Sequence, residues 1–169
     1  MNSSLINYIK ISPNKSIRTH SIDTITIHCT AAQCTIEALG ELFYKTSTRS
    51  SSNYGVAKDG KIGMFVEENQ RSWCSSSRSN DDRAITIEVS SDSFHPYRVT
   101  TEAYNGLIDL LVDICLRNNI EKLVWSFEKN ERIKHLNGCN MTVHRDFAEK
   151  ACPGDYLYNL HPLIAEQVN

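Results

Sequence analysis

Two short segments with strictly alternating side chains constrain the fold of this chain most. In the first, Asp23–Cys29 (DTITIHC), the two isoleucines and Cys29 share one face, and His28 lies on the other face among threonines. In the second, Ala84–Val89 (AITIEV), two isoleucines and a valine share one face and Glu88 lies on the other. A period of two residues is typical of a strand with one buried face. Both segments are therefore predicted to be half-buried strands of one sheet.

Helical periodicity appears on either side of the second strand. Thr35 is predicted to cap a helix that reaches Lys45. The clearest helix of the chain covers about Thr101–Arg117, where apolar residues recur every three or four positions and asparagines follow the end. The apolar side of the first helix is predicted to be Ile36, Leu39, Leu42 and Phe43.

A hairpin and several shorter elements complete the predicted architecture. Two strands, around Tyr54–Ala57 and Ile62–Val66, flank a Lys-Asp-Gly-Lys turn that is typical of hairpins. Towards the carboxyl terminus we expect a short strand at Lys122–Trp125, an irregular stretch over Ser126–Met141 and a last helix over Gly154–Val168. Pro162 is expected near a break of that helix. Strands that alternate with helices predict an α/β fold, with a mixed central sheet flanked by helices.

Length and composition predict one globular domain over residues 1–169. Hydrophobic residues make up 40% of the chain and charged residues 22%, which is typical of a folded domain. The formal charge of -2 comes without a basic patch, so nucleic-acid binding is not expected. The polar stretch Ser72–Arg83 is predicted to be a surface loop rather than a linker between domains.

The sequence gives no sign of membrane association. It has no apolar run of about 18 residues, so we expect no helix that spans a membrane and no stable membrane association. The first 20 residues lack the apolar stretch and the cleavage site of a secretory signal. We therefore expect the chain to be made in the cytoplasm.

The six cysteines are expected to be mostly free thiols, because a chain of this size folds without disulfides and has no export signal. Cys29 and Cys115 are expected in the core. Cys34, Cys74 and Cys139 lie in loop-like segments, where a disulfide or a regulatory thiol stays an alternative.

One triplet of residues suggests a metal site, although spacing alone supports it only weakly. His28 ends a strand on its polar face, and His144 and Cys152 lie eight residues apart on one predicted loop that could fold back over the strand end. Two imidazoles and a thiolate suit zinc, and a catalytic zinc site keeps a fourth position open for water. The alternatives are a histidine hydrogen-bonded at a strand end and a small buried cysteine.

Four strings in this order, TITIHCTA, NYGVAKDGKI, AITIEVSSD and HRDFAEKACPG, resemble the type 2 N-acetylmuramoyl-L-alanine amidases. The resemblance covers about Ile22–Leu163, and the last string is its most specific part. The family includes phage endolysins, muropeptide-recycling amidases and peptidoglycan recognition proteins, and its fold is a mixed sheet flanked by helices. Among these, the chain is most similar to lytic amidases of phages or prophages.

The resemblance implies roles for six residues and one zinc ion per chain. His28, His144 and Cys152 match the zinc ligands. Glu88 matches a glutamate that serves as a base, while Tyr54 and Lys150 match an active-site tyrosine and lysine. The alternatives are an exposed Glu88, a half-buried strand tyrosine and a solvated lysine.

The implied reaction is hydrolysis of the amide between N-acetylmuramic acid and L-alanine, so the expected partners are the peptidoglycan glycan strand and its stem peptide. We expect a lytic enzyme that reaches the cell wall through a holin-type pore, with this chain as the amino-terminal part of a longer lysin. The alternatives are a cytosolic muropeptide-recycling amidase and a non-catalytic peptidoglycan-binding module. One departure is Cys74, where many relatives have a histidine after the tryptophan.

Overall fold

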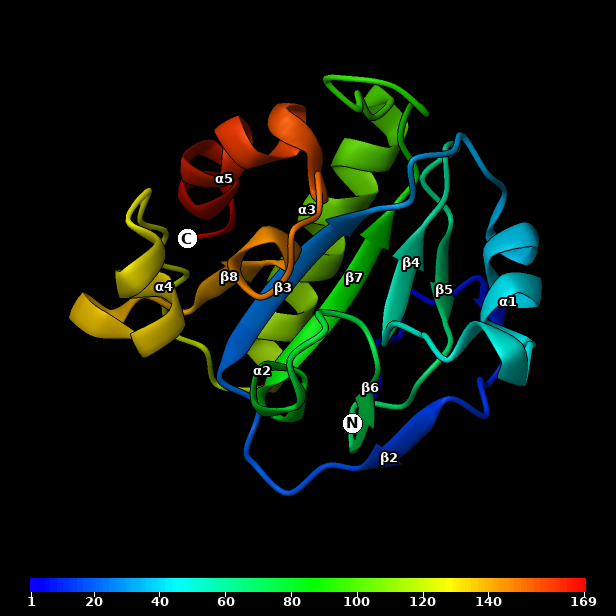
Figure 1. Ribbon diagram of the computed structural model, residues 1–169, viewed down its shortest axis with the longest axis horizontal. Coiled ribbons are helices and arrows are strands. Elements are labelled where there is room, and N and C mark those ends of the chain that lie inside the picture. The colour runs from blue at the N-terminus through cyan, green and yellow to red at the C-terminus, as the bar shows by residue number, and fades with distance from the viewer.

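A six-stranded mixed sheet forms the centre of the computed structural model, which describes residues 1–169 (Figure 1). Strands β4, β7, β3 and β8 run parallel to one another, while β5 is antiparallel to β4 and parallel to β1. This arrangement confirms the predicted mixed sheet. Across the sheet the order is β1 (Tyr8–Ile9), β5 (Ile62–Met64), β4 (Tyr54–Val56), β7 (Ala84–Val89), β3 (Thr24–Cys29) and β8 (Met141–Val143).

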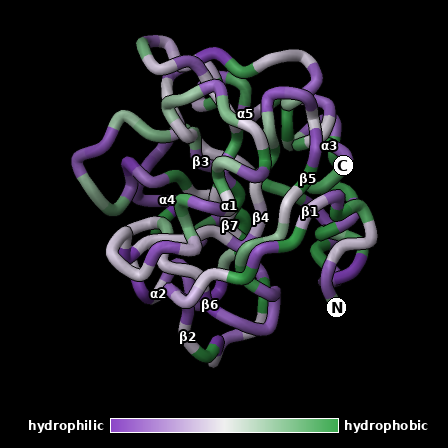
Figure 2. Tube along the Cα trace, turned by 90° about the vertical axis from the view of Figure 1, so that its right-hand side faces the viewer, coloured by the Kyte–Doolittle hydropathy of each residue, from purple (hydrophilic) through white to green (hydrophobic).

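A second, two-stranded sheet joins β2 (Lys15–Ile17) to β6 (Gln70–Ser72) in antiparallel register. Neither of these strands, nor β1, was predicted from the sequence. In Figure 2 the segments around α2, β2 and β6 are mostly hydrophilic or neutral in colour. Pairing of short edge segments depends on distant partners rather than on a local apolar pattern.

Helices cover both faces of the central sheet. The long helix α3 (Thr101–Arg117) lies behind β7 and β3 in Figure 1, and α5 (Gly154–Val168) packs beside it. On this face the isoleucines of β3 and β7 form the main core with the leucines of α3 and Leu157 of α5. The remaining helices are α1 (Ile36–Tyr44), α2 (Arg78–Arg83) and α4 (Lys129–Lys134), with short 3-10 turns η1 (Thr46–Thr48), η2 (Leu136–Gly138) and η3 (His144–Asp146).

The opposite face carries α2, which crosses in front of the sheet (Figure 1). Polar side chains fill the space beneath it: Asn80 of α2 donates to Thr26 Oγ1 (2.9 Å), and Thr142 donates to Asn80 Oδ1 (2.9 Å). Because of this cover all six residues of β3 are buried, so the prediction of a half-buried strand was wrong. A smaller apolar core lies under α1, around Phe65.

The strongest helical patterns gave correct elements. Helix α3 has the predicted bounds, and Thr100 caps it through a hydrogen bond from the Ala103 backbone N–H (3.0 Å). Thr35 caps α1 as predicted. Leu42, however, is 47% exposed, because the buried side of α1 follows Ile36, Leu39 and Phe43.

Several local predictions were wrong. Pro162 lies inside α5 without ending it; it is on the exposed side of the helix, where water can reach the carbonyl oxygen that its ring leaves without a donor. The stretch Lys122–Trp125 forms no strand. The polar stretch Ser72–Arg83 contains α2, and the stretch predicted to be irregular contains α4.

None of the helices combines the length and the apolar character needed to cross a membrane. All six cysteines are free. Cys29 and Cys115 are buried, as predicted, and Cys139 is buried as well.

Candidate metal centre and active site

Neighbouring strand ends bring the two predicted histidine ligands together. His28 lies near the carboxyl end of β3, and His144 begins the turn that directly follows β8. The two strands are parallel neighbours with Ile27 opposite Val143, so the histidines leave the sheet side by side. Their ring centroids are 5.0 Å apart with an interplanar angle of 65°.

The loop between η3 and α5 places Cys152 beside them. Its Sγ lies 3.4 Å from His28 Nδ1 and accepts a hydrogen bond from the Cys29 backbone N–H (3.3 Å). One ligand atom from each of His28, His144 and Cys152 falls within 4.8 Å of the other two. The structure therefore brings together the three residues predicted to bind zinc.

The protonation of this cluster suits a cation. Burial lowers the pKa of His28 well below its usual value, and burial together with Lys150 lowers the pKa of His144. Both imidazoles are thus neutral near pH 7, which is the form that binds metals. Burial raises the pKa of the Cys152 thiol, so a bound cation would have to displace its proton.

Two contacts identify which nitrogen of each histidine is free for a metal. His144 Nε2 lies 3.0 Å from Ser76 Oγ, and such an outer partner leaves Nδ1 as the ligand atom. His28 Nδ1 faces Cys152, whereas its Nε2 is buried without any hydrogen-bond partner. Two imidazole nitrogens and a thiol meet here, with His28 Nδ1 turned towards Cys152, and this donor set fits a bound cation such as zinc.

Glu88 lies next to this cluster. In the register of β3 with β7 it is directly opposite His28, so the two side chains lie on the same face of the sheet. Its Oε1 accepts a weak hydrogen bond from Cys74 Sγ (3.9 Å), and its Oε2 is buried without a partner. Burial raises the pKa of Glu88 to about 8.

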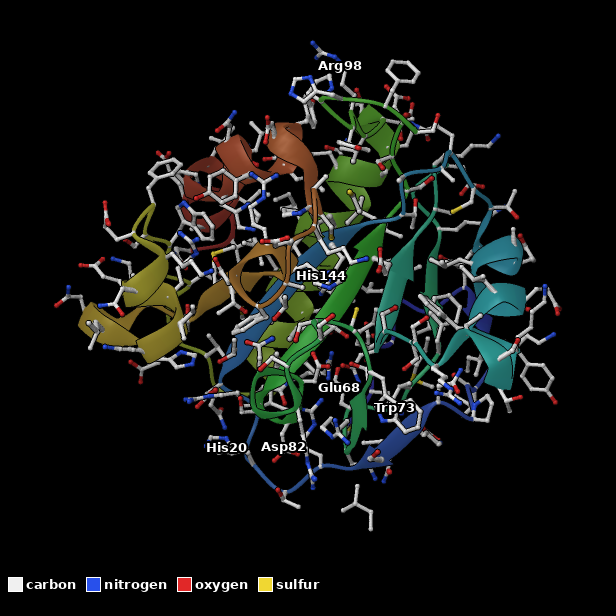
Figure 3. The ribbon with its side chains drawn as sticks, in the orientation of Figure 1. His20, Glu68, Trp73, Asp82, Arg98 and His144 are labelled. Carbon is white, nitrogen blue, oxygen red and sulfur yellow. The ribbon has the colours of Figure 1, made fainter.

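Lys150 is exposed and lines a cleft of about 360 Å³ together with His144 and Cys74. In Figure 3, His144 lies near the middle of the sheet face and Trp73 lies below it, beside β6. The Trp73 indole donates to Ser16 Oγ (2.8 Å), which anchors this side of the cleft. The cleft thus joins the metal cluster to the predicted lysine.

Sequence reasoning missed several residues of this cleft. Ser76 contacts His144, and three arginines line the walls: Arg49, Arg71 and Arg78. Ser76 and Arg78 belong to the polar stretch that was predicted to be a plain surface loop. The serines and charged residues of this stretch are equally typical of a surface loop and of the wall of a binding cleft.

Tyr54 is not part of the site, which corrects the expectation for this residue. It pairs with Ile87 rather than Glu88, so its side chain lies on the opposite face of the sheet, in the main core. Its hydroxyl donates to Glu68 Oε1 (2.6 Å) and accepts from the Ser3 backbone N–H (3.0 Å). Glu68, below the sheet centre in Figure 3, also pairs with Arg117 (2.7 Å).

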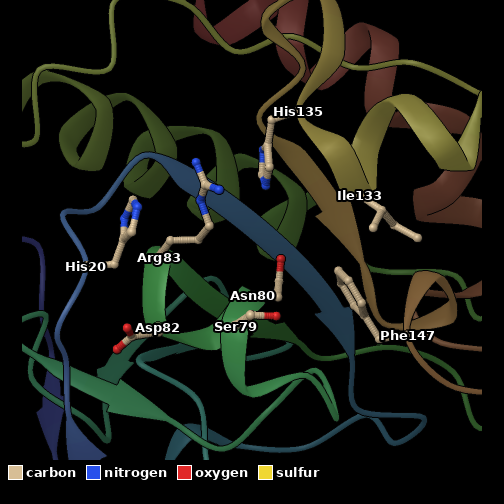
Figure 4. A pocket seen from close by; sticks show the side chains of 8 residues that line it. All are labelled: His20, Ser79, Asn80, Asp82, Arg83, Ile133, His135 and Phe147. Carbon is tan, nitrogen blue, oxygen red and sulfur yellow. The ribbon is translucent and has the colours of Figure 1, made fainter.

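Another hollow, of about 340 Å³, lies between α2, α4 and η3 (Figure 4). His20 and His135 line it together with Arg83 and Phe147. Arg83 Nε donates to Asp23 Oδ1 (2.8 Å), so its charge is already paired. None of the predicted site residues lines this hollow.

Comparisons with known proteins agree with this geometry. Residues 18–155 match the family described as N-acetylmuramoyl-L-alanine amidase. No sequence among the curated proteins matches the chain.

Solved structures share the fold at low sequence identity. A mutant endolysin from Bacillus subtilis is 18% identical with a TM-score of 0.71, over 97% of this chain and 99% of that one. The endolysin N-acetylmuramoyl-L-alanine amidase LysCS from Clostridium intestinale is 20% identical with a TM-score of 0.60, over 95% and 98%. A selenomethionine derivative of AmpD is 18% identical with a TM-score of 0.68, over 96% of each chain.

Proposed function

This chain belongs to the N-acetylmuramoyl-L-alanine amidase family, and on that premise we propose that it is a zinc-dependent lytic enzyme of a phage or prophage. The substrate is the amide that joins N-acetylmuramic acid to L-alanine in peptidoglycan. The observation that carries the proposal is the meeting of His28, His144 and Cys152 from three separate segments, at the end of an open cleft.

Three side chains would hold the ion, and they leave room for chemistry beside it. His28, His144 and Cys152 form a three-ligand set, which is typical of catalytic rather than structural zinc sites. When bound, zinc lowers the pKa of a coordinated water to about 7 and polarises a carbonyl group.

Glu88 is the residue that moves protons. Its carboxyl group lies beside His28, which is directly opposite it in the pairing of β7 with β3. Burial favours the protonated form, which can donate to the departing amine, whereas a cation nearby favours the carboxylate, which can accept a proton from water. The same group can therefore serve both halves of the hydrolysis.

Lys150 and the arginines of the cleft supply positive charge. Lys150 lines the cleft beside His144, close enough to lower the pKa of that histidine. An ammonium group there can stabilise the oxyanion that develops on the scissile carbonyl. Arg71 and Arg78 add charge that suits the carboxylates of a stem peptide.

Two other functions would use the same fold. A non-catalytic peptidoglycan-binding module needs no metal ligands, and the complete His28, His144 and Cys152 set favours an enzyme. A cytosolic recycling amidase would act on soluble muropeptides rather than intact wall. A lytic role places the enzyme at the cell wall after release through a holin-type pore.

The test is amine release from purified peptidoglycan, with zinc-loaded protein, zinc-stripped protein and Cys152→Ser in parallel. We expect new L-alanine amino termini only with the zinc-loaded wild type. A zinc-loaded protein that binds the wall and frees no amine would establish the binding module instead. Loss of turbidity of a wall suspension, compared with cleavage of soluble muropeptides, separates the lytic from the recycling enzyme.

A further inference from the structure

A second set of metal-binding side chains adjoins the first. His28, Cys74 and Glu88 offer one ligand atom each within 4.8 Å of one another. They provide imidazole, thiolate and carboxylate, the three ligand types that zinc accepts in proteins. Only His28 is shared with the set that contains His144 and Cys152.

The shared histidine has a nitrogen to spare. His28 is fully buried; its Nδ1 faces the Cys152 sulfur at 3.4 Å, while its Nε2 has no hydrogen-bond partner. Glu88 Oε2 is a second buried atom without a partner in the same set. These two buried polar atoms without partners lie beside a free thiol, an arrangement that is costly without an ion and that a bound cation would satisfy.

The protein holds Cys74 in place for this contact. Both oxygens of the Asp81 carboxylate bind the loop: Oδ2 accepts from the Cys74 backbone N–H (3.0 Å), and Oδ1 accepts from the Ser75 backbone N–H (3.0 Å). Asp81 is itself buried in α2. The Cys74 thiol therefore points at Glu88 from a fixed loop rather than from a mobile one.

We propose that His28, Cys74 and Glu88 form a second zinc site, which binds an additional ion and inhibits the enzyme. The inference rests on the proposed function, because His28 would serve both ions. Binding of the second ion releases the proton of the Cys74 thiol and the remaining N–H proton of the His28 ring. It also occupies the Glu88 carboxylate, so the group that would accept the proton of the attacking water is lost.

Equilibrium dialysis of metal-free protein against zinc, with the bound metal counted, tests the site directly. We expect two ions per chain for the wild type and one for Cys74→Ser. The matched control is Cys34→Ser, which removes another half-buried thiol, one that belongs to neither ligand set and donates a weak hydrogen bond to Thr30 Oγ1 (3.9 Å); it should keep two ions. Glu88→Gln should also lose the second ion, and far-UV circular dichroism checks that each variant is folded.

Titration with cadmium gives an independent reading, because each thiolate ligand adds charge-transfer absorbance. The wild type should show two equal increments and Cys74→Ser only the first. Excess zinc should lower wild-type amidase activity by at least about tenfold, since a general base contributes about 10²- to 10⁴-fold.

The outcomes separate this inference from the function on which it rests. One ion in the wild type, lost in Cys152→Ser and kept in Cys74→Ser, overturns the second site and leaves the amidase centre intact. Two ions in both the wild type and Cys74→Ser also overturn it. A wild type that binds no zinc overturns the proposed zinc-dependent function itself.

Discussion

Individual side chains in this protein have roles set by the sheet face on which they lie. Glu88 and His28 face each other across β7 and β3, so they share the polar face. On β4, Gly55 is the residue that pairs with Glu88. Tyr54 precedes Gly55 by one residue, so its side chain lies on the opposite face, in the core. Because the period of a strand is two, a shift of one residue separates a catalytic position from a structural one.

The Tyr54→Phe substitution should reduce stability and leave catalysis intact. It removes the hydrogen bond to Glu68 and the acceptor for the Ser3 N–H, both buried, so we expect the free energy of unfolding to fall by about 1–3 kcal/mol. Denaturant unfolding measures the loss, and kcat on peptidoglycan should match the wild type. The control Tyr44→Phe changes an exposed tyrosine and should affect neither quantity. A large fall in kcat for folded Tyr54→Phe would return this residue to the active site.

The Glu88→Gln substitution should have the opposite profile. It keeps the shape of the side chain and removes the proton acceptor, so we expect kcat to fall by about 10²- to 10⁴-fold. One zinc ion per chain and substrate binding should be retained. Steady-state kinetics measures kcat, and metal analysis counts the bound zinc. The control is Glu37→Gln, which changes an exposed glutamate on α1. Full activity in Glu88→Gln would assign proton transfer to another group.

At the scale of elements, α5 supports the loop that carries Cys152. Its buried His161 stacks against Trp125, with ring centroids 4.2 Å apart, and donates from Nδ1 to the Leu157 carbonyl (2.7 Å). A residue that precedes a proline is usually extended. Here the helix continues through Pro162, and its apolar side places His161 in the core.

Burial of His161 should make the stability of the fold depend on pH. Burial lowers its pKa from 6.5 to about 4, so between these values the unfolded chain binds the proton and the folded chain does not. Stability is therefore complete above pH 6.5 and falls as the pH drops towards 4, by at most about 3 kcal/mol. Urea unfolding across this window should show a flatter slope for His161→Phe than for the wild type. His20→Gln, at an exposed histidine, should keep the wild-type slope; equal slopes in all three proteins would exclude His161 as the cause.

The sequence predicted elements well where the pattern was long or strictly alternating. Helix α3 and the shared face of His28 and Glu88 depend on local periodicity, and the structure confirms both. The register between β4 and β7 depends on residues far apart in the sequence, so the sequence alone could not predict on which face of the sheet Tyr54 lies. The alternation of Tyr54 with Val56, both apolar, was nevertheless a visible sign of a core position.

Polar segments were the least predictable elements for a related reason. Helix α2 consists of RSNDDR, which has no apolar side, and it is held by Asp81 and Asn80 through hydrogen bonds to the loop and to Thr26. A pattern of hydrophobic residues cannot reveal a helix that packs through polar contacts. This helix covers the sheet beside the metal cluster, so the missed element is also the one that forms a wall of the site.

For the whole molecule, the metal cluster joins segments that are far apart in the sequence: β3, the turn after β8 and the loop before α5. A ligand that binds only the folded state stabilises it by RT ln(1 + [L]/Kd), which is about 2.7 kcal/mol when free zinc exceeds Kd a hundredfold. For a chain of this size that corresponds to a rise in Tm of roughly 5–10 °C.

We expect thermal unfolding of the wild type to show this rise when zinc is added to stripped protein, and Cys34→Ser to show it equally. Cys152→Ser should show a smaller rise than the wild type, because a weakened first ligand set raises the Kd of its ion. An equal rise in Cys152→Ser would mean that the stabilising ion is bound elsewhere, and the three-segment cluster would then not be the metal centre of this fold.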